Sequence, residues 1–313
     1  MFSRLSSKSK VEKILLVSLT NIGDVILTFP VFDVLRERFP EAEISVVVGP
    51  KARSLLEDNP HVYRLYVYDK RASVKEQWRW LRSVRSQDFD LVVDLRNSMM
   101  PFLVKGRVLT RPVLGCKPKC HMKDKHMGRL DLVLKDVTPS RSRLALYVSS
   151  SDEKYAHGLL KGRKDYVVLA PGAADDRKRW SEERFAEIGK YLMRNYKAGI
   201  VIVGDKNDAK IAERLLKNGS QGIVNIAGQT NLPQLGAVLK GAKLAITNDS
   251  GIMHMASYLN IPVIALFGPT DPECYGPWSG NRYVLRQGPS MEKIQVADVC
   301  SAIDDWFHGH AAI

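Results

Sequence analysis

The sequence predicts an α/β protein with two domains, each built on a parallel sheet, and three observations support this. Short apolar runs of strand length alternate with segments of helical periodicity. The alternation weakens near the middle of the chain and then starts again. At 313 residues the chain is long enough for two medium-sized domains, each with its own core. We place the domains at residues 1–161 and 162–313.

The first series begins with a strand from Lys13 to Leu19, followed by a turn over Thr20 to Asp24. A helix is expected from Val25 to the stop at Phe39-Pro40, with Pro30 kinking it. The remaining elements of this series are strands at 43–48, 62–68 and 89–94 and helices at 51–58, 74–85 and 152–160. Residues 105–143 show a weaker pattern and are expected to form loops and short elements.

The second series begins with the strand Tyr166–Ala170, and Ser181 is expected to cap the first helix. Further strands are expected at 199–204, 222–226, 243–247 and 261–267, and helices at 207–217, 232–241, 252–259 and 296–306. The last of these helices closes the C-terminal domain. Because strands and helices alternate, both sheets should be parallel.

Composition narrows the class of protein. A hydrophobic content of 45% and a charged content of 26% are typical of a soluble globular protein. The apolar run Ile14–Leu19 after the basic start is too short for a signal peptide, which favours a cytoplasmic protein. Four cysteines do not make a disulfide framework. Cys116 and Cys120 with His121 and His126 could suggest zinc, but free thiols are the preferred interpretation, so no metal site is expected.

The net charge of +13 is concentrated in the first half of the chain. Residues 1–150 hold 27 Lys and Arg against 16 Asp and Glu, a net +11, which leaves +2 for residues 151–313. Residues 105–143 alone hold 11 basic residues against three acidic ones. This distribution predicts an acidic partner for the first domain, whether nucleic acid, anionic lipid or a phosphorylated saccharide.

The segment 245–271 contains the most informative pattern. An apolar strand ends at Thr247, and Asn248-Asp-Ser-Gly251 then supplies turn and N-cap residues before a helix. The free N–H groups at the start of that helix attract phosphate, and His254 lies one turn further on. Asp249 as a simple helix cap and His254 as a core residue remain alternatives.

Asp249-Ser-Gly-Ile-Met-His254, followed by a strand ending Phe267-Gly-Pro-Thr-Asp271, resembles the signature of the ADP-heptose:lipopolysaccharide heptosyltransferases, glycosyltransferase family 9. The resemblance implies the GT-B fold, in which two Rossmann-like domains face each other across a cleft. It also implies that Asp249, Ser250, Gly251 and His254 bind the donor.

Asp24 is the first catalytic candidate, because Asn21-Ile-Gly-Asp24 stands at the carboxyl end of the first strand. A dinucleotide-binding turn is disfavoured, since Gly23 is a lone glycine where that motif needs three. The resemblance matches Asp24 to the aspartate proposed as the family's catalytic base. Without the resemblance, a helix cap is the more ordinary role.

Lys178 is the second candidate. It lies in the loop after strand Tyr166–Ala170, where a lysine can neutralise a leaving diphosphate. Lys178-Arg-Trp180 fits the family's Lys-x-Trp pattern. Ala173 and Ala174 stand where some members have hydroxyl residues that bind phosphate, so those contacts must come from elsewhere.

The nucleoside end of the donor has weaker candidates. Asp205 and Asp208 follow the strand ending at Gly204 and could accept hydrogen bonds from a ribose, and Asp208 fits the resemblance better. Thr230 falls where the resemblance suggests that the base is contacted. Asp175-Asp176 and Asp304-Asp305 are adjacent pairs, not the spaced Asp-x-Asp of metal-dependent transferases, so a metal-independent enzyme without a cofactor is expected.

The sequence thus predicts an inverting transferase that moves heptose from ADP-heptose to the phosphorylated inner core of lipopolysaccharide. Arg111, Lys117 and Lys119 are the expected acceptor-binding residues, and a position at the inner face of the cytoplasmic membrane is compatible with the basic first domain. One alternative is another nucleotide sugar or another acceptor. A different class, a basic nucleic-acid-binding protein, is disfavoured because 105–143 contains no aromatic residue for stacking on bases.

Overall fold

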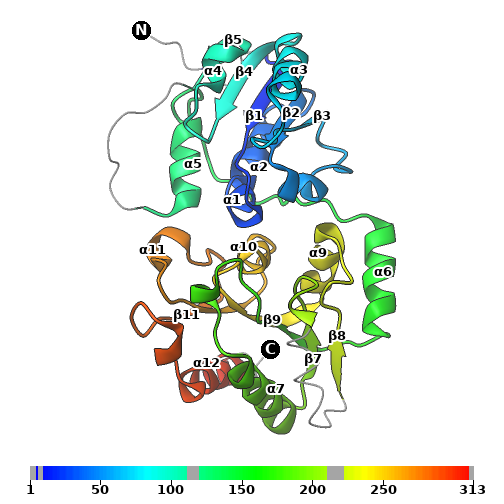
Figure 1. The fold of residues 1–313 in the computed structure, drawn as a ribbon, viewed down its shortest axis with the longest axis vertical. Helices are drawn as coiled ribbons and strands as arrows, with labels where there is room; N and C mark the ends of the chain where they lie inside the picture. Colours follow the sequence, from blue (N-terminus) through cyan, green and yellow to red (C-terminus); the bar gives the residue numbers. More distant parts are fainter. Residues whose placement is uncertain (1–4, 6–9, 111–119, 210–221, 310–313) are drawn as a thin grey trace. The chain divides into compact units, whose positions relative to one another are not determined.

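The computed structural model describes residues 5, 10–110, 120–209 and 222–309, which divide into two units, Met1–Tyr147 and Val148–Ile313. Each unit is an α/β layer structure with one parallel sheet (Figure 1). The expected fold class is confirmed. Helix α6 (Ser150–Leu160), which we expected to end the first domain, packs on α9 (Leu232–Lys240) and lies in the second unit.

The sheet of the first unit has the strand order β3-β2-β1-β4-β5. Its strands are β1 (Lys13–Val17), β2 (Glu43–Val48), β3 (Arg64–Val67), β4 (Asp88–Asp94) and β5 (Lys105–Leu109). All neighbouring strands are parallel. The central strand β1 is buried from Ile14 to Val17, as expected for a parallel sheet that helices cover on both faces.

Pro30 starts a helix here and does not kink one, so the expected continuous helix is wrong. The structure has α1 (Ile22–Ile26) and, after a short break, α2 (Phe29–Arg38) with Pro30 in its first turn. The first turn of a helix tolerates proline, because its N–H groups have no partner within the helix.

The other helices of the first unit are the 3₁₀ helix η1 (Pro50–Leu55), α3 (Val74–Arg85), α4 (Met100–Leu103) and α5 (Met122–Leu130). Ser73 and Glu76 form a capping box at the start of α3, which explains why the helix begins there. The weakly patterned segment 105–143 holds strand β5 and helix α5. The sequence pattern does not predict strand β5, because its five residues are exposed or half-buried at the sheet edge and form no buried apolar run.

The sheet of the second unit has the strand order β11-β10-β9-β6-β7-β8, again parallel throughout. Its strands are β6 (Tyr166–Ala170), β7 (Gly199–Ile202), β8 (Ile223–Asn225), β9 (Ala242–Asn248), β10 (Val263–Leu266) and β11 (Arg282–Leu285). Trp180 and Phe185 meet edge to face within its hydrophobic core, with ring centroids 5.3 Å apart.

The remaining elements of the second unit are η2 (Asp176–Lys178), α7 (Glu182–Tyr196), α10 (Gly251–Tyr258), α11 (Pro272–Tyr275), η3 (Met291–Lys293) and α12 (Val296–Gly309). Ser181 caps α7 as expected. The helix expected at 207–217 falls mostly outside the described residues. None of the helices in the described ranges is long and apolar enough to cross a membrane.

Candidate functional site

The start of helix α10, at the carboxyl end of strand β9, is the centre of the site. In a parallel sheet all carboxyl ends lie on one edge, and ligands of open α/β sheets bind there. Ser250 precedes α10 in an extended conformation and does not cap it. Its hydroxyl lies 3.2 Å from the hydroxyl of Thr247 instead. The first turn of α10 also lacks acidic residues, so no carboxylate of that turn competes with an anion for its N–H groups.

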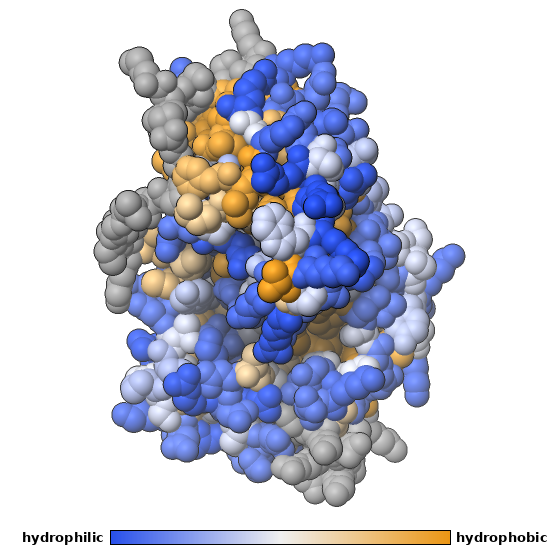
Figure 2. Space-filling model, turned by 45° about the horizontal axis from the view of Figure 1, so that its top comes forward, coloured by the Kyte–Doolittle hydropathy of each residue, from blue (hydrophilic) through white to orange (hydrophobic). Residues whose placement is uncertain are grey.

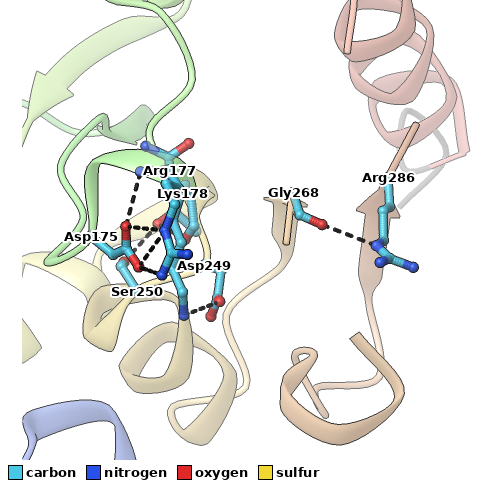
Figure 3. Close-up of polar contacts among 9 residues, drawn as sticks. Asp175, Arg177, Lys178, Asp249, Ser250, Gly268 and Arg286 are labelled. Carbon is cyan, nitrogen blue, oxygen red and sulfur yellow. Dashed lines mark hydrogen bonds and ion pairs between the residues drawn. The ribbon is translucent and has the colours of Figure 1, made fainter. Parts of the chain in front are cut away.

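Lys178 and Asp249 form an ion pair beside this helix start, with 2.6 Å between Lys178 Nζ and Asp249 Oδ2 (Figure 3). The side chain of Asp249 is 5% exposed and that of Lys178 is 28% exposed. Lys178 lies in the loop after strand β6 and Asp249 directly follows strand β9, and these two strands are neighbours in the sheet. An ammonium group and a set of uncapped N–H groups at one place favour a ligand with a diphosphate.

Asn248 fixes the loop that carries Lys178. Its side-chain amide donates to the carbonyl of Pro171 at 2.7 Å, and its oxygen accepts from the backbone N–H of Trp180 at 3.2 Å. Both ends of the 171–180 loop are therefore attached to the last residue of β9. Trp180 in turn donates its indole N–H to the carbonyl of Ile294. The side chain of Asn248 is fully buried, which makes this support rigid.

His254 lies one turn into α10 and is 4% exposed. Its ring stacks on Trp278, with centroids 5.9 Å apart and an interplanar angle of 28°. The backbone N–H of Trp278 donates to the hydroxyl of Ser257, which anchors the Trp278 loop to α10. Trp278 is absent from the sequence prediction. The only local signal is an aromatic residue after Gly-Pro, and its contact with His254 is long-range in sequence.

Asp208 is buried against the loops after β6 and β7. Its Oδ2 accepts the backbone N–H of Asp205 at 2.9 Å, and its Oδ1 has no hydrogen-bond partner in the described part of the chain. A Cβ atom placed on Gly172 or Gly204 would collide with the Asp208 carboxyl group. Burial raises the pKa of this carboxyl. Asp205 itself is exposed.

Thr230 is half-buried in the loop between β8 and α9, directly before the helix cap Asn231. This loop meets the loop after β7, because Gly228 donates its backbone N–H to the carbonyl of Gly204 at 3.0 Å. Asp208 follows strand β7 and Thr230 follows strand β8, and these two strands are neighbours in the sheet.

Arg286 is a further cation at this edge that the sequence analysis missed. It follows strand β11, and its Nε donates to the carbonyl of Gly268 at 3.2 Å, at the end of the neighbouring strand β10 (Figure 3). Strand β11 was not predicted, because only alternate residues of its four are half-buried. The strand therefore has no continuous buried run that would predict it.

In the first unit, Asp24 is half-buried in α1, which follows the central strand β1. Its Oδ2 accepts a hydrogen bond of 3.0 Å from the side-chain amide of Asn21. Asn21 is the N-cap residue of α1, and its side chain does not cap the helix. The Asp24 carboxyl group is thus oriented by one neighbouring side chain.

The expected acceptor residues Arg111, Lys117 and Lys119 lie outside the described residues. Within the described part of the basic segment, Lys105 and Arg107 pair with Asp88 and Asp90 at 3.4 and 3.6 Å. Cys120 is a free thiol. In the ranges 10–110, 120–209 and 222–309, no cluster of His, Cys, Asp or Glu is arranged to hold a metal ion.

Comparison with known proteins identifies the family. The model of "Glycosyltransferase family 9 (heptosyltransferase)" matches residues 131–302, more than half of the chain. Lipopolysaccharide heptosyltransferase 3 of Escherichia coli is 25% identical, over 90% of this chain and 95% of the relative.

Two solved structures share the fold and support the GT-B class. A family 9 glycosyl transferase from Veillonella parvula superposes with a TM-score of 0.83 at 22% identity, over 95% of this chain and 97% of that one. The E. coli ADP-heptose lps heptosyltransferase II gives 0.78 at 23% identity, over 96% of this chain and 100% of that one. The chain belongs to glycosyltransferase family 9, the heptosyltransferase family.

Proposed function

We propose that the protein is an inverting, metal-independent glycosyltransferase that moves a heptose from ADP-heptose to the phosphorylated inner core of lipopolysaccharide. The observation that carries this proposal is the Lys178–Asp249 ion pair beside the uncapped start of α10. The family supplies the reaction type, and a relative named for ADP-heptose supports this donor.

The second unit holds the donor in this proposal. Lys178, the N–H groups at Ser250 and Gly251, and His254 bind the diphosphate. Asp208 and Thr230 bind the nucleoside, and Oδ1 of Asp208, which has no hydrogen-bond partner among the described residues, is the atom left for a ribose hydroxyl. Asp249 holds Lys178 in place before the donor arrives and compensates its charge, which keeps the ammonium group ordered at the binding site.

The chemistry is a single displacement at the anomeric carbon. The oxygen of an acceptor hydroxyl forms the new bond while the bond from that carbon to the diphosphate oxygen breaks, and ADP leaves with the electron pair. The Asp24 carboxylate takes the proton from the hydroxyl. Lys178 offsets the negative charge that grows on the leaving diphosphate. Attack from the face opposite the leaving group inverts the configuration.

The first unit binds the acceptor through Arg111, Lys117 and Lys119. The net charge of +11 on residues 1–150 suits a phosphorylated saccharide. Because this acceptor is linked to lipid, we place the enzyme at the inner face of the cytoplasmic membrane, as a peripheral protein.

Thermal-shift measurements with ADP, UDP, GDP and CDP test the donor. ADP should raise the melting temperature most, because a ligand that binds only the folded state stabilises it. The Lys178→Ala variant should lose most of this shift. If UDP, GDP or CDP stabilises the protein more than ADP does, the donor is a different nucleotide sugar.

A further inference from the structure

A pocket of about 340 Å³ opens at the carboxyl end of the first unit's sheet. It is lined by the strand ends Val17 and Val47, by helix α3 and by the segment from Arg96 to Leu103. Most of its lining is apolar, and it includes aromatic side chains of α3, Trp78 and Trp80, and the sulfur-containing side chains of Met99 and Met100 at the start of α4. Such a lining suits an apolar ligand.

Large apolar side chains continue from this pocket onto the surface. Val74 and Trp78 of α3 are 72% and 62% exposed, and Met99, Phe102 and Leu103 around α4 are 63%, 58% and 42% exposed. Figure 2 shows hydrophobic residues, in orange, gathered on part of the surface of the first unit. An exposed apolar patch of this kind marks an interaction site.

Helix α3 separates its side chains into three stripes. Val84 is buried in the core and Trp80 packs against it, while Trp80 also lines the pocket together with Val74, Trp78 and Leu81. Lys75, Arg79 and Arg82 recur with the same helical spacing on a third, exposed face. None of these three cations forms an ion pair in the described part of the chain. The pattern of a tryptophan-containing apolar stripe beside a cationic stripe is typical of a helix that lies in a membrane interface.

We propose that this surface docks onto an anionic lipid bilayer, with one acyl chain in the pocket and the cations of α3 on the headgroups. Glu76 lies near Arg79 on this helix, but Lys75, Arg79 and Arg82 outnumber it, so the exposed face of α3 keeps a positive charge beside the apolar side chains. A positive face beside an apolar surface matches the two parts of an anionic lipid. Arg96 supplies a further cation inside the pocket, with its guanidinium 5.6 Å from the ring centroid of Tyr68. The surface deepens the membrane location proposed above, and binding itself needs neither donor nor acceptor.

Co-sedimentation with vesicles tests the surface. The full-length protein should bind vesicles that contain phosphatidylglycerol more tightly than vesicles of phosphatidylcholine alone, and salt should weaken this binding. Leu103→Glu places a carboxylate among the exposed apolar side chains around α4. It should lower the affinity for these vesicles by about tenfold or more. Leu132→Glu is the matched control, since Leu132 is 38% exposed in the same unit but outside the pocket, and it should bind as the wild type does.

Quenching by lipids with brominated acyl chains locates the contact. Only Trp78 and Trp80 lie in the first unit, whereas Trp180, Trp278 and Trp306 lie in the second. Brominated phosphatidylglycerol should quench the wild type, and the Trp78→Phe, Trp80→Phe double variant should keep binding but lose the quenching. Quenching that persists in the double variant overturns the proposal, as does equal binding by wild type and Leu103→Glu.

A failure of the proposed lipid surface can be distinguished from a failure of the proposed transfer reaction. Leu103→Glu should still glycosylate a deacylated, water-soluble acceptor at the wild-type rate. If neither protein glycosylates any acceptor but the vesicle results hold, the proposed function fails and the lipid surface stands. If transfer proceeds but the wild type does not bind anionic vesicles, the lipid surface fails alone.

Discussion

Asp24 and Asp152 occupy the third position of two helices, α1 and α6, but their carboxyl groups have different partners. Asp152 accepts the backbone N–H of Ser149 and completes a capping box. Asp24 accepts instead from the side chain of Asn21, and α1 has no side-chain cap. The geometry of Asp24 therefore gives little support to a purely capping role.

Replacing Asp24 by asparagine separates the two roles. An amide keeps the size of the side chain and can still accept from Asn21, but it cannot take a proton from the acceptor. We expect Asp24→Asn to lower turnover by at least about a hundredfold with little change in melting temperature. Asp152→Asn is the matched control, and it should leave turnover unchanged. A variant at Asp24 that keeps a tenth of the wild-type rate, with chemistry rate-limiting, would exclude Asp24 as the base.

Lys178 allows a second test at this scale. Lys178→Ala should lower turnover by about a hundredfold or more, because the leaving diphosphate loses its charge partner. The variant also leaves the buried carboxylate of Asp249 without a counter-ion, so its melting temperature should fall and the assay must run well below it. Arg177→Ala is the control on the same loop, since Arg177 pairs with Asp175 and is 79% exposed. An unchanged rate with saturating donor removes Lys178 from the mechanism.

Between elements, the loops after β6 and β7 fit together only because two glycines leave room for Asp208. Gly172→Ala should force the Asp208 carboxyl group or the loop backbone to move, and we expect a loss of about 1–3 kcal/mol in the free energy of unfolding, together with weaker ADP binding. Gly158→Ala in helix α6 is the control. A Cβ there meets nothing within 4 Å, so alanine should stabilise the helix by about 0.5–1 kcal/mol. Equal effects at both positions would contradict this account.

The elements that the sequence predicts well are the buried ones. Strands β1, β6 and β9 are runs of apolar residues, and each stands out because both of its faces are covered. Strands β5 and β11 are edge strands with exposed residues, so their composition does not separate them from loops.

The candidate site also has a part that the sequence predicts and a part that it does not. Asp249, Ser250, Gly251 and His254 follow one another in sequence, so their common location at one helix start is predictable. The contact of Lys178 with Asp249 joins residues far apart in sequence, and chemistry suggests it only once both are assigned to strand ends. Asn248, Trp278 and Arg286 each contact a residue far away in sequence, and no local pattern predicts those contacts.

At the scale of the whole molecule, the charge is divided unequally. Residues 1–150 carry a net +11 and residues 151–313 a net +2, so the long-range field that would attract the proposed anionic acceptor originates mainly in the first half. The proposed donor site contrasts with this, because Lys178 is paired with Asp249 there and would act on the donor at short range. Acceptor binding should therefore depend on salt much more than donor binding does.

Charge reversal in the first half tests this division. Changing Arg111, Lys117 and Lys119 together to glutamate should raise the acceptor KM by about tenfold or more and flatten its dependence on salt, while ADP affinity stays constant. The same change at Lys154, Lys190 and Lys240, which are exposed in the second unit, is the control for net charge. It should affect the acceptor KM much less, because those lysines lie outside the basic half. If the first variant instead loses ADP binding, the acceptor has been assigned to the wrong domain.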